Sequence, residues 1–110
     1  MKVAVFGSRG IRKINMAEYL PQNTDMIVSG GAIGVDRIAA RYARVSNIKL
    51  VEFLPDYDLF GKRAPVIRDK QIADYADEGI AFWDGKSKGT LYTIDFLKEK
   101  GKNVTVYIHI

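Results

Sequence analysis

Lys2–Gly10 (KVAVFGSRG) places a glycine-rich turn directly after a short run of β-branched and apolar residues. The same pattern returns in Met26–Asp36 (MIVSGGAIGVD) and in Gly79–Thr90 (GIAFWDGKSKGT). In each stretch the apolar run predicts a buried strand, and the glycines mark the point where the strand ends and a helix begins. Backbone N–H groups at helix N-termini attract anions, so the repetition of this turn predicts a pocket for phosphate.

The segments between these turns continue the alternation of strands and helices. Further strands are expected at 49–54 and 103–110, helices at 14–20, 35–43, 65–76 and 90–100, and a polar loop at 56–63. The order βαβαβαβαβ predicts an α/β fold: a single Rossmann-like domain over residues 1–110, with a mainly parallel five-stranded sheet and helices on both faces. In the expected strand order 3-2-1-4-5, the loops after the first and fourth strands meet where such sheets bind ligands.

Composition limits the classes of function. The chain of 110 residues suits one domain, and its net charge of +4 suits anionic ligands. No apolar run approaches the roughly 20 residues of a membrane span, and the first strand begins too early for a signal peptide. The sequence has no Cys and one His, His109, so we expect no disulfide and no metal site. Together these features predict a cytoplasmic protein that does not bind membranes.

The first glycine turn offers three candidate ligand-binding residues. Gly7 allows a tight exit from the strand, Ser8 and the backbone N–H groups are placed to hold a phosphate, and Arg9 is placed to clamp it. The turn matches neither the GxGxxG dinucleotide fingerprint nor the Walker A spacing. The simpler alternative is an ordinary strand-to-helix turn with a surface arginine.

The second turn adds Gly30, Gly31 and Asp36. Adjacent glycines let a ligand approach the backbone closely. Asp36 falls in the first turn of a helix, where a carboxylate complements the helix dipole. Its functional interpretation is a contact with a ribose or a base, and Asp36 is the best catalytic candidate in the chain.

Two later segments supply the remaining candidates. Arg68 and Asp69 lie on the same helix face as the apolar residues one turn later, so they should point inward, either toward a ligand or as a local ion pair. Ser87, Gly89 and Thr90 open the last helix, where they either bind an anion or simply cap the helix.

Aromatic residues near the same edge have two interpretations. Tyr57, Phe60 and Trp83 are placed to stack on a base, or they fill the core and the rim of the pocket.

These motifs together resemble the SLOG superfamily, named after the DNA-processing protein DprA/Smf and the lonely-guy phosphoribohydrolases, and most of all its small YspA/cpYpsA-related members. The matching stretches are Gly7–Arg9, Ser29–Asp36, Pro55–Asp69 and Ser87–Thr90. The resemblance implies a Rossmann-like fold that binds nucleotides or nucleotide-derived molecules. Members of the superfamily cleave nucleoside monophosphates, sense signalling nucleotides or bind single-stranded DNA.

The chain departs from the superfamily pattern in two places. The lonely-guy motif P-G-G-x-G-T-x-x-E ends in a Glu that supports N-glycosidic cleavage; here Thr93 stands at that position, and Ser87-Lys88 replaces the paired glycines. The middle motif of the family ends in Arg-Asn, where this chain has Arg68-Asp69. The catalytic Glu motif is therefore not matched, although Asp36 or Asp95 is available to replace it.

Three functions follow as hypotheses. The leading one is binding or sensing of a nucleotide-derived ligand, without any certain cofactor. The first alternative is a nucleotide hydrolase that cleaves an N-glycosidic or phosphate-ester bond. The second is binding of single-stranded DNA, for which Arg37, Arg41 and Arg44 offer a basic helix face. The resemblance also makes a homodimer an open expectation.

Overall fold

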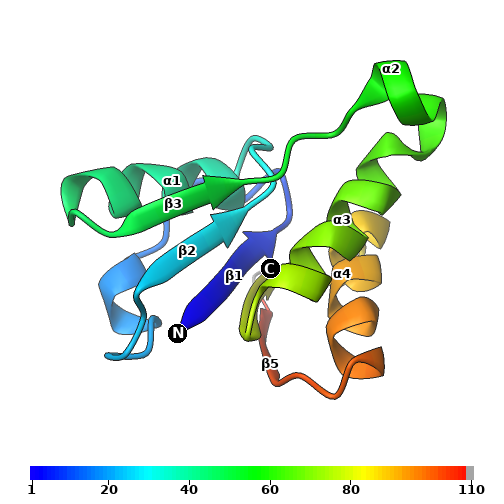
Figure 1. Cartoon of the computed structure of the whole chain (residues 1–110). Coiled ribbons are helices and arrows are strands. Elements are labelled where there is room, and N and C mark those ends of the chain that lie inside the picture. Colours follow the sequence, from blue (N-terminus) through cyan, green and yellow to red (C-terminus); the bar gives the residue numbers. More distant parts are fainter. Residues whose placement is uncertain (109–110) are drawn as a thin grey trace.

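The computed structural model describes residues 1–108 and contains a five-stranded sheet whose strands all run parallel (Figure 1). The strands are β1 (Lys2–Gly7), β2 (Met26–Ser29), β3 (Lys49–Glu52), β4 (Glu78–Trp83) and β5 (Val104–Ile108). Their order is β3-β2-β1-β4-β5, which confirms the predicted fold class and places β1 beside β4. The expected continuation of the last strand over His109 and Ile110 lies outside the described residues.

Helices cover both faces of this sheet. They are α1 (Val35–Val45), α2 (Tyr57–Phe60), α3 (Ala64–Tyr75) and α4 (Lys88–Glu99). α1 lies on one face, and α3 and α4 lie side by side on the other (Figure 1). Within residues 1–108, no helix combines the length and the apolar character that a membrane crossing requires.

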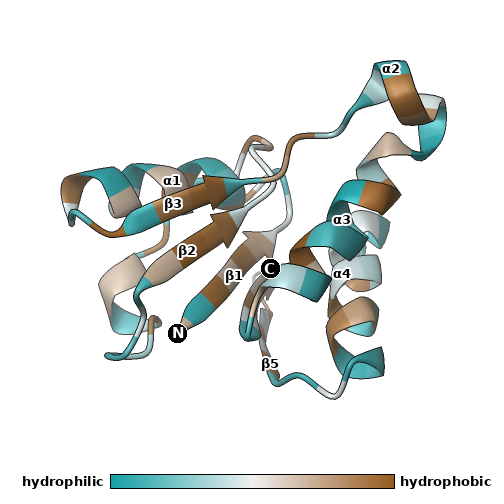
Figure 2. Cartoon of the chain, in the orientation of Figure 1, coloured by the Kyte–Doolittle hydropathy of each residue, from teal (hydrophilic) through white to brown (hydrophobic). Residues whose placement is uncertain are grey.

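The central strand β1 explains why two cores form. Its side chains alternate, so that Val3 and Val5 pack with α1 while Ala4 and Phe6 pack with α3 and α4. A strand buried on both faces is typical of parallel sheets. Figure 2 shows the consequence, with hydrophobic strands inside and hydrophilic residues along much of the outer surface of the helices.

Two local predictions are wrong. The helix expected at 14–20 is only a 3-10 turn at Met16–Glu18, because Pro21 limits its length and only Met16 of this turn is buried. The loop expected at 56–63 is largely helical: α2 is followed by a 3-10 turn at Gly61–Arg63. Asp56 starts α2, because its carboxylate accepts the N–H of Leu59 at 3.0 Å.

Candidate functional site

A cleft of about 390 Å³ opens at the carboxyl edge of the sheet, between the loops that follow β1, β2 and β4. The N-terminal parts of α1, α3 and α4 complete its walls. The predicted site residues that line it are Gly7, Arg9, Gly30, Gly31, Asp36, Arg68, Asp69, Ser87, Gly89 and Thr90. The topology therefore gathers turns that are far apart in the sequence.

Ser8 is the predicted site residue that does not line the cleft. It is 1% exposed, its N–H donates to the carbonyl of Phe82 at 2.9 Å, and its Oγ accepts the N–H of Asp84 at 3.0 Å. Asp84 in turn accepts the N–H groups of Lys86 and Ser87, and these hydrogen bonds lower the pKa of its carboxyl group. Ser8 thus links the loop after β1 by hydrogen bonds to the end of β4 and to the loop that follows it.

Close approaches between the loops require glycine at position 34 and place Gly30 against the side chain of Arg68. Gly34 has φ of 83°, and a Cβ there would lie 2.7 Å from the carbonyl oxygens of Ser8 and Arg9. A Cβ on Gly30 would lie 2.6 Å from Nη1 of Arg68. The second turn is therefore packed directly against the first turn and against α3.

Arg68 and Asp69 form a nearly buried ion pair on the inner face of α3. Nε of Arg68 donates to Oδ1 of Asp69 at 2.8 Å, and Nη1 donates to the carbonyl of Gly30 at 2.5 Å. Burial raises the pKa of the Asp69 carboxyl group, against the opposing charge of Arg68. The guanidinium is thus already engaged, which matches the ion-pair alternative drawn from the sequence.

Asp36 is the most unusual group in the cleft. It is 6% exposed; its Oδ2 accepts the N–H of Ala32 at 3.2 Å, while Oδ1 is buried and has no hydrogen-bond partner among residues 1–108. Burial raises its pKa from 3.8 to about 6, although the Ala32 hydrogen bond and the charge of Arg68 oppose the change. One carboxylate oxygen of Asp36 is therefore left without a hydrogen bond in the wall of the cleft.

The opposite charge in the cleft comes from Arg9. This side chain is exposed, lines the cleft and forms no hydrogen bond or ion pair with the described part of the chain. The start of α4 also lines the cleft, where Oγ of Ser87 accepts the N–H of Thr90 at 3.5 Å. The cleft thus offers a cation and a helix N-terminus with a serine cap, features that suit an anionic group.

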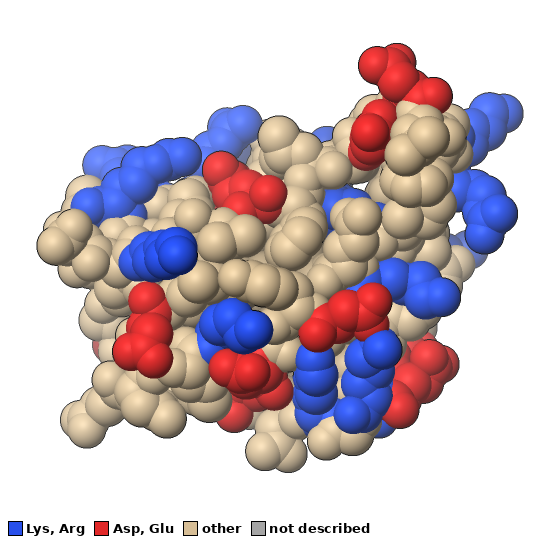
Figure 3. Space-filling view, viewed as in Figure 1, with Lys and Arg blue, Asp and Glu red and all other residues tan. Residues whose placement is uncertain are grey.

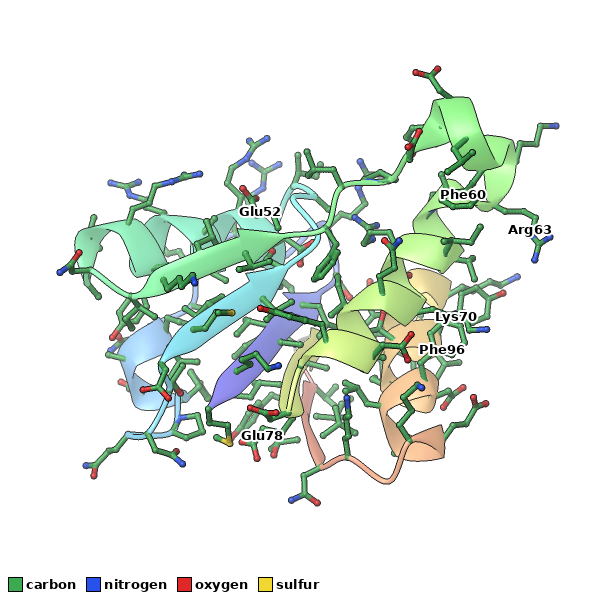
Figure 4. All side chains as sticks on the ribbon, in the orientation of Figure 1. Glu52, Phe60, Arg63, Lys70, Glu78 and Phe96 are labelled. Carbon is green, nitrogen blue, oxygen red and sulfur yellow. The ribbon has the colours of Figure 1, made fainter. Side chains whose placement is uncertain are left out.

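The fold places the three aromatic candidates in different surroundings. Tyr57 lines the cleft, whereas Phe60 and Trp83 do not. Figure 4 labels Phe60 at the projecting end near α2, and Nε1 of Trp83 donates to the carbonyl of Ser87 at 3.0 Å. Trp83 therefore fixes the loop before α4 rather than facing the cleft.

Several lining residues were not predicted as site residues. They are Phe6, Ala32, Pro55, Pro65 and Thr93. The position of Thr93 carries a usable signal, because it lies three residues after Thr90 and so shares a helix face with it. Its Oγ1 donates to the carbonyl of Gly89 at 3.2 Å. The other four have apolar side chains, and Ala32 also donates its N–H to Oδ2 of Asp36.

Two groups of opposite charge define what the cleft can recognise. It brings together a free guanidinium, that of Arg9, and a buried carboxylate oxygen, that of Asp36. Among the described residues, no group of at least three His, Cys, Asp or Glu side chains is arranged to hold a metal ion. A ligand with an anionic end and a hydrogen-bond donor would satisfy both the guanidinium and the carboxylate oxygen.

Comparison with known proteins gives one match. The model of the YspA, cpYpsA-related SLOG family matches residues 1–60, which contain β1, β2, both of their glycine turns and Asp36. No curated protein and no solved structure matches the chain. The family match covers more than half of the 110 residues and includes two of the loops that build the cleft. The chain therefore belongs to the YspA, cpYpsA-related SLOG family.

Proposed function

We propose that the cleft binds a nucleotide or a nucleotide-derived ligand. The observation that carries this proposal is the unpartnered Oδ1 of Asp36, which is buried in the wall of a cleft that also holds the free guanidinium of Arg9. A buried polar atom without a hydrogen bond costs free energy, so a ligand hydroxyl group that donates to it would be bound favourably. Membership of the SLOG family is consistent with a ligand of this class.

Each end of such a ligand has a counterpart in the cleft. Arg9 and the N-terminus of α4 would hold the phosphate, because both favour negative charge. Asp36 would accept a hydrogen bond from a ribose hydroxyl. Tyr57 stands at the rim, where its ring is available to pack against the base. Arg68 has a positioning role in this scheme, because Gly30 and Asp69 already occupy its guanidinium.

The test is a thermal-shift screen followed by calorimetric titration. The panel contains nucleoside monophosphates, ADP-ribose, NAD, cyclic nucleotides and a short single-stranded oligonucleotide. A ligand at 100 times its Kd adds about 2.7 kcal/mol of stability, which raises Tm by several degrees in a small domain. No shift with any small nucleotide would contradict the proposal, and a shift with the oligonucleotide alone would favour DNA binding instead.

A pair of arginine variants then locates the site. We expect Arg9→Ala to weaken binding of the best ligand by about ten- to a hundredfold, since hydrogen bonds to a charged group are worth about 1.5–3 kcal/mol. Arg63→Ala is the matched control, because Arg63 is exposed, does not line the cleft and points away from the body in Figure 4. Equal affinities of the two variants would remove Arg9 from the site.

A second candidate function is hydrolysis of the bound nucleotide, at its N-glycosidic or its phosphate-ester bond. The specific observation is the pKa of Asp36, which burial raises to about 6, close to the range that suits a general acid or base at neutral pH. We expect Asp36→Asn to abolish turnover while ligand binding is retained in part. If the wild-type protein leaves every nucleotide of the panel intact in a chromatographic assay, this candidate fails for those substrates.

A further inference from the structure

The strand β5 forms one edge of the sheet, close to α4 (Figure 1). It pairs with β4 on one side, and on its other side no strand of the described part of the chain pairs with it. The N–H of Gly79 donates to the carbonyl of Asn103 at 2.9 Å, so the backbone groups of Asn103 and of every second residue after it face β4. The backbone N–H and C=O groups of Val104, Val106 and Ile108 therefore point away from β4 and are unpaired.

β5 carries no charged side chain. Its sequence VTVYI has no Lys, Arg, Asp, Glu or Pro, and charged residues and Pro are what usually keep the edge of a sheet from pairing with another chain. The opposite edge, β3, has an exposed Lys49 and an exposed Glu52 at its two ends. Figure 3 shows how charged side chains of both signs are spread over the face of the molecule that it displays. β5 is therefore the edge of this sheet that is open to another strand.

A row of aliphatic side chains follows the same edge. Val104 and Val106 are only partly buried beneath α4, and Ile108, two residues further along this face, is 56% exposed. On the other face, the ring of Tyr107 packs edge-on against that of Tyr19, with centroids 4.8 Å apart. β5 is thus held firmly in the sheet while its outer row stays accessible, so little order would be lost when this edge meets a partner.

Helix α4 extends this apolar surface. Nζ of Lys70 in α3 lies 5.7 Å from the centroid of the Phe96 ring, so that side of α4 faces α3. Leu91 precedes Phe96 by five residues, a rotation of about 140° around the helix, and therefore lies on the other flank. It is 37% exposed. Because α4 packs on β4 and β5, this flank lies toward the open edge.

We propose that β5 pairs antiparallel with β5 of a second copy of this chain, about a two-fold axis at Val106. Val106 then faces Val106 of the second copy, and Val104 faces its Ile108. Each of the three residues donates its N–H and accepts at its C=O, so the free backbone groups of both edges become paired. The facing side chains are all aliphatic and no like charges oppose each other. The partner is a second copy because the outward row reads as aliphatic in both directions and so complements itself.

This contact closes at two subunits, because each copy has one such edge and the same surface is used by both. It joins the two sheets into one, with both copies of α4 on the same face, where the exposed Leu91 side chains gain apolar contact. A strand of five residues is about 17 Å long, and such an interface is smaller than the standard size, so the dimer dissociates on dilution. Neither β5 nor Leu91 lines the nucleotide cleft.

Sedimentation velocity over a range of protein concentrations measures this association. Ile108→Lys places an ammonium group against Val104 of the second copy, and Lys is a residue that protects natural sheet edges. Since Ile108 is already exposed, we expect this variant to fold and to dimerise at least about tenfold more weakly. Val45→Lys is the matched control: Val45 is 75% exposed on α1, so the same change there should leave dimerisation unaltered.

A single engineered cysteine tests the register of the two strands. The chain has no Cys, so Val106→Cys introduces its only thiol. Residues of a hydrogen-bonded antiparallel pair have Cα atoms about 5.5 Å apart, a separation that a disulfide spans. We therefore expect mild oxidation to link two Val106→Cys chains rapidly. Val45→Cys is the control for random collision, because this thiol is exposed but lies away from β5, and it should be linked far more slowly.

Three results would overturn the proposal. The first is a wild-type protein that remains monomeric at every concentration reached. The second is a dimer that Ile108→Lys leaves intact, or that Val45→Lys weakens equally. The third is a folded Val106→Cys protein that forms disulfide-linked dimers no faster than Val45→Cys. Circular dichroism and thermal unfolding establish that each variant is folded. Because β5 does not contribute to the cleft, each of these results leaves the proposed nucleotide site standing.

Discussion

The stability of the Asp36→Asn variant, measured relative to the wild type, should be greater at neutral pH than at acidic pH. The reason is that the fold buries this carboxylate and raises its pKa from 3.8 to about 6. Between these two pH values the unfolded chain releases the Asp36 proton while the folded protein keeps it, so the wild type loses stability as the pH rises. Above about pH 6 both states are ionised, and the loss is complete.

The size of this loss follows from the same two values. They differ by about 2, and each pKa unit is worth about 1.4 kcal/mol, so the free energy of unfolding of the wild type falls by about 3 kcal/mol across this window. The amide side chain of the Asp36→Asn variant has no ionisable proton, so the variant lacks this loss. Any constant effect of the amide on packing or hydrogen bonding is the same at all pH values, and it cancels when the two pH values are compared.

The assay is urea unfolding of the wild type and Asp36→Asn at intervals from about pH 3.5 to about 7.5, a range that brackets both pKa values. The stability difference between the two proteins should shift in favour of the variant by about 3 kcal/mol over this range. Other carboxyl groups titrate in both proteins, so the difference isolates Asp36. Asp84→Asn is the opposing control, because backbone hydrogen bonds lower the pKa of Asp84. The stability of this variant relative to the wild type should therefore fall as the pH rises. A stability difference between Asp36→Asn and the wild type that is the same at all pH values would refute the reasoning.

Two further predictions concern the loops that follow β1 and β2. Gly34→Ala should destabilise the protein by about 2–4 kcal/mol, because it combines a strained φ of 83° with a Cβ only 2.7 Å from two carbonyl oxygens. Gly85→Ala is the control, because Gly85 also has a positive φ, of 79°, but a Cβ there would meet no atom within 4 Å. If the clash matters, Gly85→Ala should lose less stability in thermal unfolding than Gly34→Ala; equal losses of stability would contradict a role for the clash. Ser8→Ala should cost about 1–2 kcal/mol in denaturant unfolding, because it leaves the N–H of Asp84 without its acceptor; an unchanged midpoint would show that Ser8 does not brace the loop.

The fold was predictable because local signals repeat along the chain. Three of the parallel strands read as a short apolar run followed by a glycine turn, and the alternation with helices leaves few possible topologies. The gathering of three turns into one cleft follows from that topology, since parallel strands all end at the same edge. The roles of single residues did not follow, because they depend on distant partners. Ser8 is oriented by Asp84, which is 76 residues away, and Arg68 is engaged by Gly30, which is 38 residues away.

Helix α2 (Tyr57–Phe60) was missed for a different reason. Its residues carry no apolar stripe, and α2 spans only four residues, so neither periodicity nor length indicates a helix. The deciding signal is a single cap, the hydrogen bond from the N–H of Leu59 to Asp56. One such bond is worth about 1 kcal/mol. A single capping residue gives no sequence pattern that distinguishes so short a helix from a polar loop.

Under the proposed function, the burial of Asp36 serves binding rather than folding. An aspartate at the start of α1 would complement the helix dipole just as well if it were exposed. Instead it is buried, at a cost to stability at neutral pH, and the nearby guanidinium of Arg68 cannot fully offset the charge because it is held by Asp69 and Gly30. Rotation of Arg68 toward Asp36 would break both of those hydrogen bonds. The fold therefore keeps one carboxylate oxygen unsatisfied in the same cleft as Arg9, which costs stability in the empty protein; under the proposed function, a ligand that paired with both groups would offset that cost.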